Sequence, residues 1–249
     1  MPDELTNLAK KYLTDKWDGH FYTPHYERFF NHLKNEPVKL LEIGVGGYGD
    51  PNSGGESLRM WKEYFPQGAI FAIDIYNKES IEEDRIKIYQ GSQVDKFFLE
   101  SVTSEAGKFD IIIDDGSHIN RHIIESFKLL FPTLKQHGIY VVEDLQTSYW
   151  PKFGGDSFNL RNKSTAMNYF KHLTDSLNYE EIDNPSYRAN YFDRNIISIS
   201  FFHNIIFIQK GPNNEGSNII KNNAKPTRHP VKANLGYALR SITRYFSRG

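Results

Sequence analysis

Carboxylates and a histidine follow two apolar runs of the sequence, at the points where buried strands would end. The first run, 111–113, leads into Asp114 and Asp115, and His118 follows three residues after Asp115. The second run, 139–142, leads into Glu143 and Asp144. Because the carboxyl ends of parallel strands meet at one edge of a sheet, these side chains are expected to lie close together.

The expected chemistry of this edge is that of a hard divalent cation. Asp115, Glu143 and Asp144 offer oxygen ligands, and the sequence contains no cysteine, so magnesium or manganese suits the site better than zinc. His118 could act there as a general base, because an imidazole titrates near neutral pH. Each residue alone also has a structural alternative: Asp114 or Asp115 could cap the following helix. Their combination beside a glycine-rich loop favours a functional site.

That glycine-rich loop, 44–55, lies between an expected strand at 38–44 and an expected helix at 57–65. Strand, glycine turn and helix together build the nucleotide-binding edge of an open parallel sheet. The spacing departs from G-x-G-x-x-G, and no P-loop lysine follows, so a flexible loop without a ligand remains the alternative. The next expected strand, 69–74, ends in Asp74, where an acid typically accepts hydrogen bonds from ribose hydroxyls.

The periodicity through residue 143 alternates strands with helices. It therefore predicts an α/β fold with a doubly wound, mostly parallel sheet. A C-terminal antiparallel hairpin is expected at 196–202 and 205–209. The remaining expected elements are helices at 5–13, 26–33, 95–102, 121–134 and 164–177, and strands at 86–89, 109–114 and 139–143. Pro132 is expected to end or kink the helix in which it lies.

Three regions are expected along the chain. An N-terminal helical cap spans 1–35, the catalytic domain 36–210, and a basic tail 211–249 with seven lysines and arginines and one acid. An apolar face recurs at helical spacing over 232–247, so this part of the tail could form an amphipathic helix on an anionic membrane surface. Packing on its own domain or on another subunit is the alternative.

Composition narrows the function classes further. The formal net charge of -1 gives no sign of a nucleic-acid partner, and the absence of cysteine excludes disulfides. The acidic, polar N-terminus is not a signal peptide, and no apolar run approaches the ~20 residues that span a bilayer. A cytoplasmic protein is therefore expected, with peripheral contact at the inner membrane face through the tail as a further hypothesis.

Five segments carry a family resemblance, in the same order along the chain: 41–48 (LEIGVGGY), 54–61 (GGESLRMW), 71–76 (FAIDIY), 113–118 (IDDGSH) and 142–145 (VEDL). The sequence from about 14 to 150 resembles the magnesium-dependent sugar O-methyltransferases of macrolide and related antibiotic pathways. The resemblance implies a class I S-adenosylmethionine fold, S-adenosyl-L-methionine as cofactor and Mg²⁺ (or Mn²⁺) as metal. It implies methylation of a sugar hydroxyl on a glycan or glycosylated metabolite, and it is compatible with a homo-oligomer.

The resemblance also implies roles for individual residues. The metal ligands would be Asp115, Glu143 and Asp144, with His118 as the catalytic base. The residues lining the cofactor would be Thr23, Glu42, Gly44, Tyr48, Asp74, Ser92, Gln93 and Asp95. Within that set Asp74 would lie on the ribose, and Ser92, Gln93 and Asp95 near the adenine. Asp114 would contact the cofactor or only brace its turn.

The sequence differs from the antibiotic enzymes in two ways and leaves two other functions open. It is expected to lack the long N-terminal domain that precedes their catalytic domain, and it has its own basic tail. One alternative is a metal-dependent hydroxylase of the cephalosporin hydroxylase type, which would need two histidines and a carboxylate around iron. His122 is the other histidine close in sequence to His118. The second alternative is a non-catalytic binding protein on the same fold.

Overall fold

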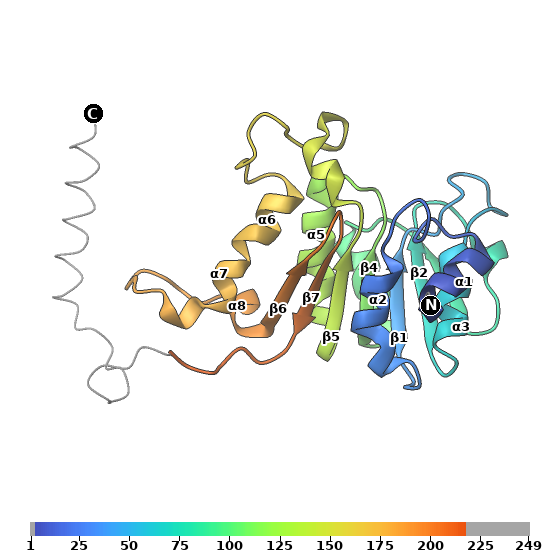
Figure 1. The fold of residues 1–249 in the computed structure, drawn as a ribbon, viewed down its shortest axis with the longest axis horizontal. Coiled ribbons are helices and arrows are strands. Elements are labelled where there is room, and N and C mark those ends of the chain that lie inside the picture. Colours follow the sequence, from blue (N-terminus) through green and yellow to red (C-terminus); the bar gives the residue numbers. More distant parts are fainter. Residues whose placement is uncertain (1–2, 218–249) are drawn as a thin grey trace.

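The structure, a computed structural model, describes residues 3–217 and is built around one seven-stranded sheet, whose arrangement can be followed in Figure 1. The order of strands across the sheet is β3-β2-β1-β4-β5-β7-β6. Strands β1 to β5 pair in parallel, whereas β7 runs antiparallel to both β5 and β6. The strands are β1 (Lys39–Ile43), β2 (Ala69–Asp74), β3 (Ile86–Gln90), β4 (Phe109–Asp114), β5 (Leu134–Val142), β6 (Ile196–Phe201) and β7 (Ile206–Lys210). The predicted fold class, including the C-terminal antiparallel hairpin, is confirmed.

The helices lie on both faces of this sheet. The α-helices are α1 (Glu4–Tyr12), α2 (Thr23–Phe30), α3 (Glu56–Tyr64), α4 (Lys96–Ala106), α5 (Asn120–Leu130), α6 (Ala166–His172), α7 (Thr174–Leu177) and α8 (Tyr191–Asn195). Short 3₁₀ turns complete the connections: Asn31–Leu33, Glu79–Ile81, Phe131–Thr133, Leu145–Tyr149, Pro151–Phe153 and Tyr179–Glu181.

Alternate residues of the central strands enter two separate cores. In β4, Ile111 and Ile113 pack into the core formed with α1, α2 and α3, while Ile112 packs into the core formed with α4, α5 and α6. A strand buried on both faces must be apolar at every position, which explains the uninterrupted isoleucines of this run. The N-terminal helices share the first core, where Tyr26 and Phe30 of α2 pack with Leu40 of β1.

Several element ends differ from the sequence predictions. Helix α5 ends at Leu130, and Pro132 stands in the following 3₁₀ turn, as its missing N–H group favours. The helix predicted over 164–177 is divided at Leu173, whose N–H is shared between two carbonyls, while the Thr174 hydroxyl donates to the carbonyl of Lys171. Strand β5 begins five residues earlier than predicted, at Leu134.

The amphipathic helix predicted over 232–247 lies outside the described residues. Among the helices of 3–217, none is long and apolar enough to cross a membrane.

Candidate active site

Three strand ends bring the predicted site residues to one edge of the sheet. In the β4–β5 ladder Asp114 stands opposite Val142, so the segments that follow the two strands leave side by side. Gly44, directly after β1, lies against the same place. It has a φ of +98°, and a Cβ at this position would lie 2.3 Å from the carbonyl oxygen of Asp115. Only glycine permits this backbone and this approach, so Gly44 sets how closely the glycine-rich loop meets the carboxylate segment.

Asp115, His118 and Asp144 converge at this edge. Each offers one ligand atom, and these atoms lie within 4.8 Å of one another. His118 and Asp144 both have left-handed backbones, with φ of 55° and 54°, a conformation that is concentrated at functional sites in non-glycine residues. Two carboxylates and an imidazole fit a hard divalent cation. His122, which a hydroxylase site would need, is outside this group, and its Nδ1 is hydrogen-bonded to the Ser117 hydroxyl at 2.9 Å.

Glu143 lies deeper than this group. Its side chain is 2% exposed, and its Oε1 accepts hydrogen bonds from the Lys16 ammonium at 2.7 Å and from the Tyr26 hydroxyl. Burial raises the pKa of Glu143 well above its usual value, and the nearby Asp115 raises it further, while Lys16 opposes the shift. Glu143 is expected to be a metal ligand, and its carboxylate is already in contact with the Lys16 ammonium.

The N-terminal loop, residues 13–22 between α1 and α2, contacts the site through His20 and Tyr22, which were not among the predicted site residues. Tyr22 donates a hydrogen bond from its hydroxyl to Asp144 Oδ1 at 2.8 Å, and His20 Nε2 lies 3.5 Å from the same oxygen. The rings of His20 and Tyr22 are stacked, with centroids 4.7 Å apart. Residues 15–24 are rich in polar and aromatic groups, but no local pattern pairs them with Asp144, which lies more than a hundred residues away.

Asp74 fastens the glycine-rich loop to the end of β2. Its Oδ2 accepts from the backbone N–H of Val45 at 2.9 Å, and its Oδ1 accepts from that of Tyr76 at 2.8 Å. Tyr48, in the same loop, has a φ of 46° and is 86% exposed. An acid at the end of the second strand suits the ribose of a nucleoside.

Glu42 points from β1 to the side of the sheet that α3 covers. Its Oε2 accepts from the Trp61 indole N–H at 2.7 Å. Its Oε1 is buried and forms an ion pair with the Lys16 ammonium at 3.2 Å. Burial raises the pKa of Glu42, and Lys16 opposes that shift.

Asp114 braces the turn that carries Asp115 and His118. Its oxygens accept hydrogen bonds from Gln93 Nε2 at 3.1 Å and from the Ser126 hydroxyl. Gln93 in turn accepts at its Oε1 from the backbone N–H of Ser117 at 2.9 Å. Burial raises the pKa of Asp114 to about 6, against the lowering effect of the Ser126 hydrogen bond. These contacts favour the bracing role over the contact with cofactor.

Three other residues expected at the cofactor form hydrogen bonds within the described chain. Asp95 is the N-cap of α4 and accepts from a backbone N–H of its first turn at 3.1 Å. The Ser92 hydroxyl accepts from the N–H of Val94 at 3.4 Å. Thr23 is fully buried, and its hydroxyl pairs with that of Thr6 at 2.7 Å. Their proposed cofactor contacts stay predictions.

An aromatic segment borders the site beyond His118. The Phe153 ring lies 6.5 Å from the His118 ring and 6.0 Å from that of Trp150, which is half-exposed. Asn120, at the start of α5, fixes this segment by donating to the carbonyls of Thr147 at 3.1 Å and Phe153 at 2.9 Å. These hydrogen bonds fix the two aromatic rings next to His118.

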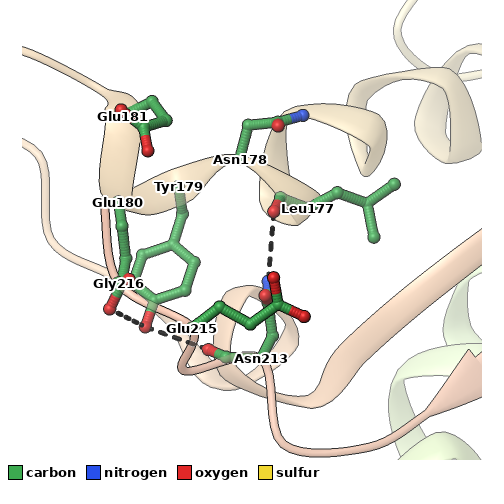
Figure 2. A pocket seen from close by; sticks show the side chains of 8 residues that line it. All are labelled: Leu177, Asn178, Tyr179, Glu180, Glu181, Asn213, Glu215 and Gly216. Carbon is green, nitrogen blue, oxygen red and sulfur yellow. Dashed lines mark hydrogen bonds between the residues drawn. The ribbon is translucent and has the colours of Figure 1, made fainter. Parts of the chain in front are cut away.

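A surface pocket elsewhere contains none of the predicted site residues. Figure 2 shows the Tyr179 hydroxyl donating to Glu180 and to the carbonyl of Asn213. The residues that line the pocket are Leu177, Asn178, Tyr179, Glu180, Glu181, Asn213, Glu215 and Gly216. This pocket is separate from the edge of the sheet at which the candidate site lies.

Comparison with known proteins identifies sugar O-methyltransferases as relatives. The chain is 47% identical over 215 residues to demethylmacrocin O-methyltransferase of Streptomyces fradiae, covering 86% of this chain and 54% of that protein. It is 45% identical to mycinamicin VI 2''-O-methyltransferase of Micromonospora griseorubida, with the same two coverages. A solved structure of the MycE methyltransferase with Mg, SAH and mycinamycin VI has a TM-score of 0.80 and 44% identity, over 86% of this chain and 56% of that one.

The chain thus spans about half the length of the curated relatives that it matches. No family model matches the sequence.

Proposed function

Because the chain belongs to the same family as these sugar O-methyltransferases, we propose that it transfers a methyl group from S-adenosylmethionine to a sugar hydroxyl. In the net reaction an S–CH₃ bond is exchanged for an O–CH₃ bond, the sulfonium becomes a thioether, and one proton is released. The products are S-adenosylhomocysteine and a methyl ether. The acceptor would be a sugar on a glycan or on a glycosylated metabolite.

The observation that carries this proposal is the convergence of Asp115, His118 and Asp144 at the carboxyl edge of the sheet, beside Gly44. Asp115 and Asp144 would hold the metal, with Glu143 as the third ligand. A bound divalent cation would lower the pKa of a sugar hydroxyl that it contacts. In the related MycE structures the crystals contain Mg and SAH, so both groups suit a protein of this fold.

The residues of this chain would position the acceptor and remove its proton. His118 would accept the hydroxyl proton, since its Nε2 lies 3.8 Å from Asp144 Oδ2 within the group and its backbone is fixed by the turn that Asp114 and Gln93 brace. Trp150 and Phe153 would pack against the apolar face of the sugar ring. Most of the acceleration would come from orientation and electrostatics, because no covalent intermediate with the protein is needed.

The cofactor would lie on the glycine-rich side of the edge. Asp74 would accept from the ribose hydroxyls, with Tyr48 covering the nucleoside and Glu42 near the amino acid end. Ser92, Gln93 and Asp95 would lie near the adenine, and Thr23 would reach the cofactor from the start of α2. A homo-oligomer and contact of the tail 211–249 with the inner face of a membrane are further parts of the proposal.

A titration and an acceptor screen test the proposal. Calorimetry with S-adenosylmethionine is expected to show binding, and a lack of heat at millimolar ligand would refute the methyltransferase assignment. Transfer of labelled methyl groups to a panel of glycosides is expected to require magnesium, to stop in EDTA and to return when magnesium is added. Full transfer in EDTA would remove the metal from the mechanism while leaving the reaction class intact.

A further inference from the structure

Lys16 joins three carboxylates that are far apart in the sequence. Its side chain is 0% exposed, and its ammonium lies 2.7 Å from Glu143 Oε1 and 2.8 Å from Asp115 Oδ2. The third carboxylate, Glu42, has its Oε1 at 3.2 Å. A single cation thus contacts two proposed metal ligands and one residue of the proposed cofactor side.

This environment differs from that of the other buried lysines in the described chain. Lys78 is 1% exposed and donates to the backbone carbonyls of Asp50 and Ser53, at 2.6 and 2.9 Å. Lys210 donates in the same way to the carbonyls of Pro132 and Leu134. Neutral carbonyls are sufficient to hold a buried ammonium in this fold, so the three carboxylates around Lys16 need another explanation.

Formal charge supplies that explanation. Glu42, Asp115, Glu143 and Asp144 bring four carboxyl groups to one edge of the sheet, and the Lys16 ammonium lies within 3.2 Å of the first three. Carboxylates removed from water repel one another strongly unless a cation lies between them. When all four carboxyl groups are ionised, a divalent cation and a sulfonium would together supply the three positive charges that Lys16 leaves unbalanced.

We propose that Lys16 is the fixed counter-cation of the active site, a positioning residue that holds Asp115 and Glu143 in place before the divalent cation binds and links them to Glu42. The inference rests on the proposed function, because it assumes that Asp115 and Glu143 serve a metal site. Lys16 lies in the N-terminal loop that also carries Tyr22, so the ammonium at the same time fixes this loop over the strand ends. The loop is therefore part of the catalytic centre.

The test compares Lys16→Met with Lys78→Met. Both substitutions replace a fully buried ammonium by an apolar chain of similar length, but only the first removes a partner of carboxylates. Thermal unfolding of the full-length protein is measured in EDTA and in magnesium. In EDTA the Lys16→Met variant is expected to melt about 10 °C below wild type, because a buried charge cluster loses its partner. Magnesium should then raise its melting temperature by more than it raises that of wild type.

The matched control separates a charge effect from a packing defect. Lys78→Met is expected to shift the melting temperature equally in EDTA and in magnesium. If Lys16→Met behaves in the same way, with a magnesium response no larger than that of wild type, the counter-cation role is refuted.

A second variant keeps the test decisive where Lys16→Met folds poorly. The double variant Lys16→Met/Glu143→Gln removes one of the unbalanced charges and is expected to melt higher in EDTA than Lys16→Met alone. No gain from the second substitution would overturn the inference. If calorimetry finds no binding of magnesium to wild type, the metal part of the proposed function fails. The role of Lys16 is then decided by whether the double variant melts higher in EDTA than Lys16→Met.

Discussion

Replacing Gly44 by alanine should destabilise the protein at the candidate site, although Gly44 has no side chain that could take part in chemistry. The added Cβ would lie 2.3 Å from the carbonyl oxygen of Asp115, and the φ of +98° is unfavourable for any L side chain. The backbone conformation costs about 1–2 kcal/mol, and forcing a methyl group into a packed contact costs a further ~1–3 kcal/mol. The expected loss is therefore roughly 2–5 kcal/mol in the free energy of unfolding, or about 5–15 °C in melting temperature.

Two other glycines separate the contact from the backbone conformation. Gly154 has a φ of +75°, and a Cβ added there would have nothing within 4 Å, so Gly154→Ala should lose only the backbone part. Gly46 has a φ of +81°, and its nearest neighbour would be 3.8 Å from the added Cβ. Thermal unfolding of the three variants measures the difference. Equal losses for Gly44→Ala and Gly154→Ala would refute the reasoning that Gly44 sets the approach of the glycine-rich loop to Asp115.

Three further predictions concern catalysis and pH. His118→Ala should lower methyl transfer by about 10²–10⁴-fold with calorimetric affinity for S-adenosylmethionine nearly unchanged, and a large loss of cofactor binding would contradict its role as base. Trp150→Ala should raise the KM for the sugar acceptor more than it lowers kcat, whereas an unchanged KM in the acceptor titration would exclude Trp150 from sugar binding. Burial lowers the pKa of Lys210 to about 8, below its ordinary value of 10.5. The unfolded chain therefore binds more protons between these values, so the unfolding free energy from urea titrations should rise with pH from 8 to 10.5, and Lys210→Met should remove this rise.

The sequence carried enough signal to predict the framework of the site. Apolar runs that end in acids predicted the ends of β4 and β5, and the glycine-rich loop predicted the end of β1. Buried parallel strands are apolar along their whole length, so the polar residues that follow them mark where they end. The ends of elements were less well predicted, since β5 begins at Leu134 through a polar stretch that resembles a turn. The contacts of Lys16 were missed for a different reason: its partners lie 99 and 127 residues away, and no local pattern pairs them.

The alternation of side chains along the strands explains why the carboxylates have different surroundings. Ile112 and Asp114 of β4 point to the side of α5, which is where Asp114 meets Ser126. Side chains two residues apart in a strand point to the same face. Glu42 therefore points the same way as Leu40, and Glu143 the same way as Val141, which is toward the core that contains α1 and α2. That face is the one over which the N-terminal loop passes, so a cation from this loop is the group able to reach both acids. Strand alternation together with the position of the first helices thus determines that the counter-charge comes from before β1, and not from the loops that follow the strands.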